Sequence, residues 1–397
     1  MFKAYKYRIY PNNSQKELIE KTFGCCRLVY NLALETKMNA WDSGRVNLSA
    51  FDLIKQLTDL KREFTWLKKV DSQALQAAIK NLDNAYKGFF NGKGFPKFKT
   101  KINRQSFKSP NGVIRIDWNN NALTIPKIKN ISITLSRKFE GKIKTVTISK
   151  TCTGKYFASI LVDDGKELPY PPPVSIEKSI GIDTGIKSFV VTSDGRTFEA
   201  NRKLKESIDR LKVLQRRASK KKKGSANRKK ANLRVALLHE KIANRRLDYI
   251  HKVTHDLTSD NQAVSTIFVE DLNVKKMLLD SNLAQAISDV SLGKFYEILG
   301  YKCKWKGINL IKIGRYDPSS KRCNACGEIN QSLTLKDRTW KCSSCGTNLD
   351  RDDNAAQNIL WYGIQYLNNK TGAGSSEEPV EEPTLVGPVK QENINVN

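Results

Sequence analysis

The sequence predicts an α/β protein made of several domains. Between residues 113 and 162, short apolar runs alternate with turn signals, a pattern typical of a small β-barrel. From residue 179 onward, strands and helices follow one another in a different order and predict a second, mixed domain. Near the C-terminus, two Cys-x2-Cys pairs stand fifteen residues apart, a spacing typical of a zinc ribbon.

The first domain is predicted to begin with a strand at 2–10, where aromatic or apolar residues alternate with basic ones until Pro11 ends the run. The other barrel strands are expected at 113–116, 122–125, 131–135, 145–149 and 156–162. After the first strand, Ser14 and Glu17 form a predicted capping box, which begins a helix that ends near Trp41. Two more helices are expected at 49–64 and 71–90, so the helices would be an insertion into the barrel.

A proline-rich linker at 169–173 predicts the start of the second domain. The elements expected after it are strands at 179–182, 189–192 and 197–198, a helical hairpin at 203–260, a strand at 264–269, a helix at 291–306, a strand at 310–313 and a helix at 354–367. This succession is that of a ribonuclease H-like domain. The residues after Lys370 are rich in Gly, Ser, Glu and Pro, which predicts a disordered tail.

The paired cysteines predict a structural metal site. Four thiolates, from Cys323, Cys326, Cys342 and Cys345, can surround one Zn²⁺ tetrahedrally at about 2.3 Å each. Gly327 and Gly346 follow the second cysteine of each pair, where the turn favours positive φ. Four thiolates leave no open position for a substrate, so this zinc is expected to be structural. The remaining cysteines are predicted to be buried thiols in a reducing compartment: Cys25, Cys26, Cys152 and Cys303.

Three acids form a second candidate site. Asp183 ends an apolar strand, Glu270 ends a buried strand, and Asp352 precedes a helix that opens with small residues. Singly, each is typical of a turn or of a helix N-terminus. Together, in one sheet domain, they predict a site for two Mg²⁺ ions roughly 4 Å apart, with Asp183 bridging both. The three histidines lie away from these acids, so the pattern favours metal-dependent phosphodiester hydrolysis over covalent catalysis.

The charge of the chain predicts its partner. The sequence has 69 Lys and Arg residues against 40 Asp and Glu residues, a net charge of +29. Such an excess opposes compaction unless a polyanion is bound, so nucleic acid is expected. No run of about 18 consecutive apolar residues occurs, and the first residues lack the apolar core of a signal peptide. We therefore expect a cytoplasmic protein that does not enter the membrane.

Motifs along the whole chain carry a resemblance to a known family. They are Arg8–Pro11 with Gln15, Gly94–Lys99, Gly181–Lys187, Val269–Leu272, Pro318–Ser320, Asp350–Asp352 and Asn354–Ala356. In these motifs together the chain resembles TnpB, the RNA-guided, Cas12-like nuclease of IS200/IS605-type transposons. The family's RuvC triad would correspond to Asp183, Glu270 and Asp352, the last because the family's acid stands two residues before the Asn.

The resemblance also implies a domain arrangement and a set of partners. The implied domains are a wedge β-barrel at 1–10 and 92–170, a helical recognition lobe at 11–91, a RuvC nuclease domain at 171–316 and 347–370, a zinc-ribbon target-binding insert at 317–346 and a disordered tail at 371–397. The implied partner is a transposon-derived guide (omega) RNA, which pairs with DNA beside a transposon-adjacent motif. The implied activity is cleavage of double-stranded DNA by a monomeric ribonucleoprotein that also holds single-stranded DNA at the prokaryotic nucleoid.

Three groups of residues are expected to contact nucleic acid. Lys97, Lys99 and Arg104 lie in a basic segment with interleaved aromatics, which suits an RNA backbone and stacked bases. Gln73 and Gln76, on the predicted helix 71–90, can read base edges by bidentate contacts, although a solvated helix face is the alternative. At the hairpin tip, the alternatives are a phosphate clamp and a solvated loop, formed by Lys220, Lys221, Lys222 and Lys223.

Two other functions compete with the nuclease. A guide-dependent repressor that binds DNA without cleaving it would be expected to lack acids of the triad, whereas all three are present here. A transposase that joins DNA strands would need a catalytic tyrosine–histidine signature, which the pattern does not offer.

Overall fold

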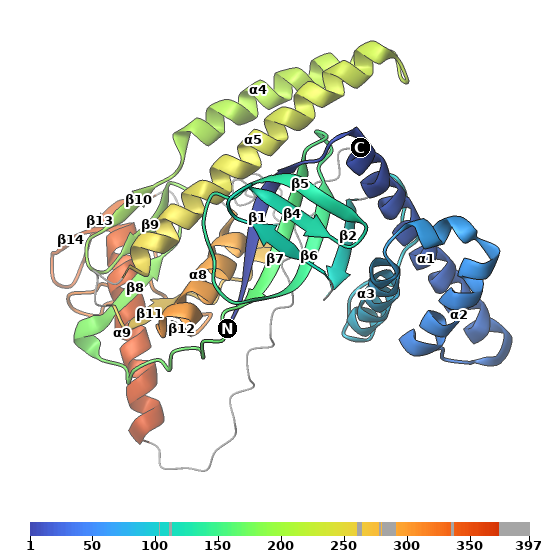
Figure 1. Cartoon of the computed structure of the whole chain (residues 1–397). Helices are drawn as coiled ribbons and strands as arrows, with labels where there is room; N and C mark the ends of the chain where they lie inside the picture. Colours follow the sequence, from blue (N-terminus) through green and yellow to red (C-terminus); the bar gives the residue numbers. More distant parts are fainter. Residues whose placement is uncertain are drawn as a thin grey trace. The chain divides into compact units, whose positions relative to one another are not determined.

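The computed structural model describes residues 1–102, 104–110, 113–259, 264–277, 279, 291–334 and 337–372 (Figure 1). The chain divides into two compact units. Unit 1 holds Met1–Leu168 and Lys203–Arg245, and unit 2 holds Pro169–Arg202 and the residues from Arg246 onward. The first boundary falls at the proline-rich linker. Among the described residues, no helix is both long enough and apolar enough to cross a lipid bilayer.

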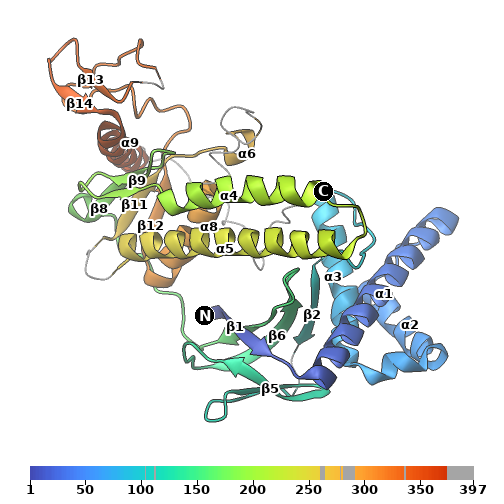
Figure 2. The same ribbon diagram turned by 90° about the horizontal axis from the view of Figure 1, so that it is seen from above.

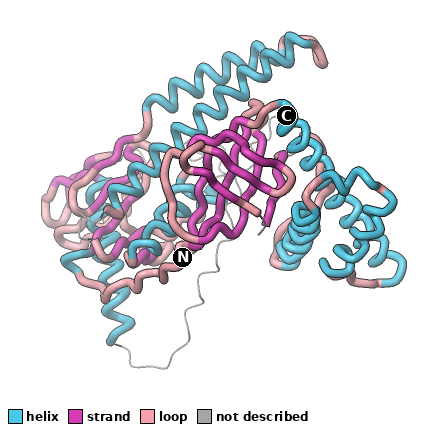
Figure 3. Tube along the Cα trace, in the orientation of Figure 1, coloured by secondary structure: helices cyan, strands magenta, loops and turns pink. Residues whose placement is uncertain are grey.

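Unit 1 contains a seven-stranded antiparallel sheet with the order β2-β6-β7-β1-β5-β4-β3. Figure 3 draws the strands in magenta. Its strands are β1 (Phe2–Tyr10), β2 (Gln105–Pro110), β3 (Arg115–Asp117), β4 (Ala122–Ile125), β5 (Ile128–Thr134), β6 (Lys142–Lys150) and β7 (Tyr156–Asp163). The predicted first strand does join the later strands, because β1 pairs with both β5 and β7. The edge strands β2 and β3 are not paired with each other in the described part of the chain, so the pairing is that of an open sheet.

Three α-helices of unit 1 lie between β1 and β2 in the sequence and pack at the β2 end of the sheet. They are α1 (Asn13–Gly44), α2 (Ala50–Glu63) and α3 (Ser72–Phe90), with a short 3-10 turn η1 (Thr65–Lys69). Phe23 of α1 and Phe107 of β2 approach to 5.7 Å between ring centroids, so the helices and the sheet share one apolar core.

The predicted capping box at Ser14 and Glu17 is wrong by two residues. Asn12 is the N-cap of α1: its side chain accepts from the Gln15 backbone N–H, and the Gln15 side chain accepts from the Asn12 backbone N–H in return. Asn12 has the extended conformation of an N-cap, which leaves Ser14 inside the first turn.

A helical hairpin follows the first strands of unit 2. It consists of α4 (Arg202–Ser219) and α5 (Ala226–Leu257), which run side by side in both views (Figures 1 and 2). Apolar side chains from both helices meet between them: Leu211, Ala218, Val235 and Ile242. On α5, Glu240 accepts a hydrogen bond from Thr153 at 2.6 Å and pairs with Lys155 at 3.0 Å, which attaches this part of the hairpin to the β6–β7 turn.

Unit 2 contains a five-stranded mixed sheet with the order β10-β9-β8-β11-β12. Its strands are β8 (Ser179–Asp183), β9 (Ser188–Thr192), β10 (Thr197–Glu199), β11 (Thr266–Val269) and β12 (Asn309–Lys312). The strands β8, β11 and β12 are parallel, and β9 and β10 extend the sheet antiparallel. The helices that follow are α6 (Val274–Met277), α8 (Leu292–Lys306) and α9 (Arg351–Gly372). The predicted succession of strands and helices is confirmed.

The last helix begins at Arg351, three residues earlier than predicted. The cause is Asp350, whose side chain accepts hydrogen bonds from the backbone N–H groups of Asp352 at 2.9 Å and Asp353 at 3.2 Å. Asp350 therefore acts as the N-cap, and Asp352 lies in the first turn of α9.

Helix α9 packs closely on the sheet where glycines permit it. A Cβ at Gly181 of β8 would lie 2.3 Å from the Ala356 carbonyl oxygen, and a Cβ at Gly363 would lie 2.2 Å from the Phe268 ring. The small residues that open α9 allow this close approach, which places the start of α9 beside the end of β8.

One prediction about the unpaired cysteines is wrong. Cys25, Cys26 and Cys303 are buried, as expected, whereas Cys152 is exposed. Cys152 belongs to the turn between β6 and β7, in which the backbone of Thr151 pairs with that of Lys155 and the Cys side chain is left at the surface. The predicted disordered tail at 371–397 lies almost entirely outside the described residues.

Candidate metal centres and nucleic-acid interface

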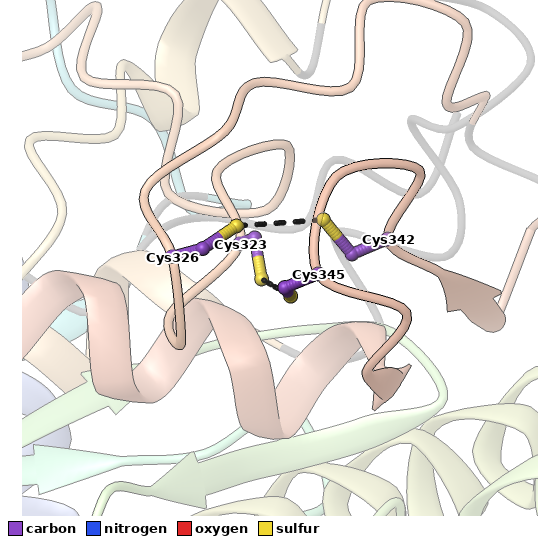
Figure 4. A group of neighbouring side chains, drawn as sticks. All are labelled: Cys323, Cys326, Cys342 and Cys345. Carbon is purple, nitrogen blue, oxygen red and sulfur yellow. Dashed lines mark hydrogen bonds between the residues drawn. The ribbon is translucent and has the colours of Figure 1, made fainter.

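The four paired cysteines come together at one point (Figure 4). All four sulfur atoms lie within 4.8 Å of one another; the Cys323–Cys345 pair is separated by 3.7 Å and the Cys326–Cys342 pair by 3.5 Å. Sulfur atoms at about 2.3 Å from a tetrahedral Zn²⁺ stand about 3.8 Å apart, so the four thiolates fit that ion.

The backbone around the cysteines forms two equivalent knuckles. The Gly327 N–H donates to the Cys323 carbonyl and the Gly346 N–H donates to the Cys342 carbonyl, at 2.9 and 3.0 Å. Both glycines have positive φ, 85° and 72°, as the sequence predicted. The strands β13 (Thr339–Lys341) and β14 (Asn348–Asp350) complete the ribbon, which leads directly into α9.

The three predicted acids gather at one edge of the unit 2 sheet. In the parallel pair β8–β11, Val269 is opposite Ile182, so Glu270 and Asp183 are the next residues at the same ends of two neighbouring strands. The carboxyl ends of parallel strands are where α/β sheets bind ligands. Asp352 approaches this edge on the first turn of α9, which Gly181 allows to lie against β8.

The pKa of Asp183 responds to both of the other acids. Burial, and then the negative charges of Glu270 and Asp352, raise the pKa of Asp183 to about 8. Burial also raises the pKa of Glu270, although a hydrogen bond from Ser319 and the positive charge of Arg351 oppose the shift. A partly buried carboxylate whose pKa is raised by two neighbouring acids marks a place that a divalent cation would stabilise, and carboxylate oxygens are the ligands Mg²⁺ prefers.

The three carboxylates do not share one coordination shell. Among the described residues, the cysteine cluster is the one group of three or more His, Cys, Asp or Glu side chains whose ligand atoms all lie within 4.8 Å. Two of the acids have another side-chain partner: Glu270 accepts from Ser319 at 2.5 Å, and Asp352 faces Arg338 at 3.6 Å.

The basic segment after α3 borders a small pocket of unit 1. Asn31 of α1 fixes the Lys99 backbone with two hydrogen bonds of 2.8 and 2.9 Å, and the Lys99 Nζ lies 3.7 Å from the centre of the Tyr30 ring. The pocket, about 50 Å³ in volume, is bordered by four basic side chains: Arg27, Lys99, Arg104 and Lys108. Lys97 is exposed nearby in the sequence.

The other predicted contact residues are accessible. Gln73 on the first turn of α3 is exposed and Gln76 is half-buried, while the neighbouring Leu75 and Ile79 face the core. The hairpin tip between α4 and α5 is a tight turn in which Gly224 has a φ of 85°. All four lysines of this tip are exposed.

Three residues beside the acids were missed by the sequence analysis. Ser319 bonds Glu270, Arg351 brings positive charge to both Asp183 and Glu270, and Tyr296 of α8 shares a 2.9 Å hydrogen bond with Thr184, next to Asp183. Ser319 lies in the Pro318–Ser320 motif and Arg351 lies between two acids, but neither position reveals its contact, because the partners are remote in the chain.

Comparison with known proteins places this architecture in a family. The model of the family described as "Probable transposase" matches residues 159–280, that of a "Cas12f1-like, TNB domain" matches residues 293–359, and that of a "Helix-turn-helix domain" matches residues 1–45. In this structure the last of these segments forms β1 and α1.

Relatives match over nearly the full length. A candidate RNA-guided DNA endonuclease of Streptomyces pristinaespiralis is 38% identical, covering 98% of this chain and 96% of that protein. The candidate RNA-guided DNA endonuclease InsQ of Escherichia coli K12 is 31% identical, covering 96% and 97%. A TnpB-like protein of Acanthamoeba polyphaga mimivirus is 23% identical, covering 91% and 73%.

A solved structure shares the fold. The chain aligns with the Cas12f1 protein of a "Cas12f1-sgRNA-target DNA complex" with a TM-score of 0.57 and 15% identity, covering 91% of this chain and 98% of that one. The fold and the cysteine site thus define a mixed α/β protein with a zinc-ribbon-like domain. The length and identity of these matches show that the chain belongs to the TnpB family.

Proposed function

We propose that this protein is an RNA-guided DNA endonuclease. It binds a transposon-derived guide RNA and cleaves double-stranded DNA beside a transposon-adjacent motif. The observation that carries the proposal is the meeting of Asp183, Glu270 and Asp352 at the carboxyl edge of one sheet, in a chain of net charge +29 whose full-length relatives bear that name. Acids alone would repel the phosphates of DNA. Acids that hold divalent cations, in a basic chain that binds nucleic acid, suit the cleavage of a phosphodiester bond.

The domain arrangement proposed for this function is that of the family. Residues 1–10 and 92–170 are assigned to the wedge domain, whose described strands pair as an open sheet rather than the predicted barrel. Residues 11–91 are assigned to a recognition lobe, 171–316 and 347–370 to a RuvC domain, and 317–346 to a target-binding zinc ribbon. The parallel β8–β11–β12 core with its antiparallel β9 and β10 supports the RuvC assignment, because this is the strand order of a ribonuclease H-like sheet. The functional complex is proposed to be a monomeric ribonucleoprotein at the nucleoid.

Asp183, Glu270 and Asp352 are the residues assigned to hold two Mg²⁺ ions. Bound there, the ions would neutralise charge at the scissile phosphate and lower the pKa of the attacking water. The protein's own part is to bring the carboxylates to one partly buried edge of the sheet and to hold Glu270 through Ser319. Arg351 offsets part of their negative charge, as its effect on the pKa of Asp183 and Glu270 indicates.

The sequence of the target is proposed to be read by the guide, and the protein to hold backbones. Lys97, Lys99 and Arg104, together with the pocket beside them, suit phosphate groups of single-stranded nucleic acid. The exposed lysines 220–223 suit a phosphate clamp, and Gln73 and Gln76 suit base edges of the adjacent motif.

The test begins with the native ribonucleoprotein. The chain is expressed with its flanking DNA, the co-purified RNA is sequenced, and cleavage is measured on plasmids that carry the matching target beside a randomised flank. Asp183→Ala is expected to abolish Mg²⁺-dependent cleavage and to leave RNA binding unchanged. Asp209→Ala, which removes an exposed acid of α4, is the matched control. Undiminished cleavage by Asp183→Ala would refute the triad assignment.

A guide-dependent repressor without cleavage is the second candidate. The presence of all three acids, in positions where they raise the pKa of Asp183, favours the nuclease. If the native ribonucleoprotein binds a matching target in Mg²⁺ and leaves it intact, the repressor is the better description.

A further inference from the structure

The hydroxyl of Ser319 makes the shortest described contact to one of the three acids. Its Oγ donates to the Glu270 Oε1 at 2.5 Å, and the serine itself is only 5% exposed. A hydrogen bond of this length to a partly buried carboxylate fixes the rotation of that group. Ser319 is not a ligand candidate in its own right, because its hydroxyl is already directed at Glu270.

Ser319 is in turn held by helix α9. The side-chain amide of Asn358 donates to the Ser319 carbonyl at 2.8 Å. Asn358 is completely buried, and its Oδ1 accepts from the Arg322 guanidinium at 2.8 Å. A buried amide with both ends bonded is a rigid support, since breaking either contact leaves a polar group without a partner.

The same helix grips the first zinc knuckle. The Arg322 carbonyl, just before Cys323, accepts from Asn354 at 2.7 Å and from Asn358 at 2.6 Å. On the other side of Cys323, the Asn324 N–H donates to the Asn354 Oδ1 at 2.9 Å. The Arg322 guanidinium also lies 3.8 Å from the centre of the Trp361 ring. Cys323 is therefore held on both sides by two asparagines of α9.

These contacts form a continuous path from the zinc ribbon to Glu270. We propose that Ser319 is a positioning residue for the Glu270 carboxylate, and that the folded zinc knuckle sets the place of Ser319 through Asn354 and Asn358. The proposal rests on the proposed function, because it takes Glu270 to be a ligand of the catalytic ions. It gives the ribbon a second task beyond its own folding: fixing one ligand of a site that lies outside it.

The test measures metal binding apart from cleavage. Mn²⁺ serves as the spectroscopic probe for the Mg²⁺ site, and its affinity is measured by electron paramagnetic resonance on the zinc-loaded, full-length ribonucleoprotein. Ser319→Ala is expected to weaken Mn²⁺ binding about 10-fold, the usual effect of losing a group that orients a ligand. Zinc content should stay at that of the native protein. The matched control, Ser320→Ala, should bind Mn²⁺ with native affinity.

A second pair separates the hydroxyl from packing. Ser319→Thr keeps the hydroxyl and Ser319→Val has the same shape without it, so any cost of the added volume is common to both. We expect Thr to bind Mn²⁺ at least about three-fold more tightly than Val, roughly half the logarithmic effect of the 10-fold loss expected for Ser319→Ala. Equal affinities in this pair, or native affinity in Ser319→Ala, would overturn the proposal.

The native protein and Asp183→Ala are measured in parallel with the Ser319 variants, so that failure of the proposed function or of its metal site can be distinguished from failure of the positioning role alone. If the native ribonucleoprotein does not cleave a matching target, the proposed function itself fails. If Asp183→Ala keeps both Mn²⁺ binding and cleavage, the assignment of the three acids as the metal site fails, and the positioning role of Ser319 fails with it. If Asp183→Ala loses both while the Ser319 variants behave like the native protein, the nuclease assignment stands and only the positioning role is refuted.

Discussion

Replacing Asp183 by Asn should stabilise the metal-free protein, and the gain should depend on pH. In the folded chain, burial and the charges of Glu270 and Asp352 raise the pKa of Asp183 from 3.8 to about 8. An acid with a higher pKa in the folded state binds protons more tightly when folded. The free energy of unfolding therefore falls as pH rises through the window from about 4 to about 8. The side-chain amide introduced by Asp183→Asn does not titrate, so the variant is free of this loss in the free energy of unfolding.

The magnitude follows from the width of the window. One unit of pKa difference corresponds to about 1.4 kcal/mol, so a full shift would cost about 4 kcal/mol at pH 7. Because Glu270 also titrates upward, one substitution recovers only part of this, and we expect about 2 kcal/mol at pH 7. For a unit of this size that is a rise in melting temperature of about 4–8 °C. Near pH 4.5 the gain should fall below about 1 kcal/mol.

The assay is thermal or urea unfolding of the full-length, RNA-free, zinc-loaded protein without Mg²⁺. Chelators are left out because they would remove the structural zinc. Asp209→Asn is the control, since that exposed acid pairs with Lys212 on α4 and should gain nothing. Adding Mg²⁺ should stabilise the native protein more than Asp183→Asn. A gain that is equal at pH 4.5 and pH 7, or absent at both, would contradict the electrostatic reasoning.

Three further predictions concern packing and nucleic acid. Gly181→Ala should lower the free energy of unfolding by about 1–3 kcal/mol, because its Cβ would lie 2.3 Å from the Ala356 carbonyl oxygen; Gly300→Ala, whose nearest neighbour is at 3.9 Å, should be neutral or stabilising by denaturant titration. Changing the four tip lysines 220–223 to Gln should weaken RNA binding and reduce its salt dependence in filter-binding assays. Unchanged binding, or an equal loss when four exposed lysines elsewhere are changed (Lys16, Lys55, Lys68 and Lys69), would favour the solvated loop. Gln76→Ala should alter the preferred adjacent motif in a randomised-flank assay, and an unaltered preference removes Gln76 from the reader.

Local sequence patterns predicted most of the fold, because each helix or strand produces a recognisable pattern within a few consecutive residues. Strand alternation, the glycine turns and the cysteine spacing depend only on neighbours, and the strand 2–10 was correctly joined to strands more than a hundred residues away. The errors are of the same local kind. Asn12 and Ser14 are both residue types that can cap the start of α1, and the fold uses Asn12. In the same way α9 begins after Asp350 rather than at Asn354. Either polar side chain could accept hydrogen bonds from the free N–H groups of a first helical turn.

The candidate site was predicted less completely, since its contacts join distant segments. Strand ends identify Asp183 and Glu270, but no local signal pairs Ser319 with Glu270, 49 residues away, or Arg338 with Asp352. The exposed Cys152 is a similar case: its turn is visible in the sequence, whereas the direction of the side chain depends on the β6–β7 register. Sequence patterns thus give the acids, and only the tertiary fold gives the groups that hold them.

Helix α9 contacts both the cysteine site and the elements that carry the three acids. Its backbone reaches β8 only because Gly181 has no side chain, and the same approach brings Asp352 toward the ends of the strands. Further along α9, Asn354 and Asn358 are 1% and 0% exposed. Their side-chain amides donate to backbone carbonyls of the zinc knuckle and of the segment that holds Glu270. A displaced α9 would therefore move Asp352 and leave two buried amides without partners at the same time. The close packing of α9 on β8, which the small helix residues and Gly181 allow, thus supports both the acid site and the zinc ribbon. A substitution that moves α9 away from β8 should therefore damage both sites at once.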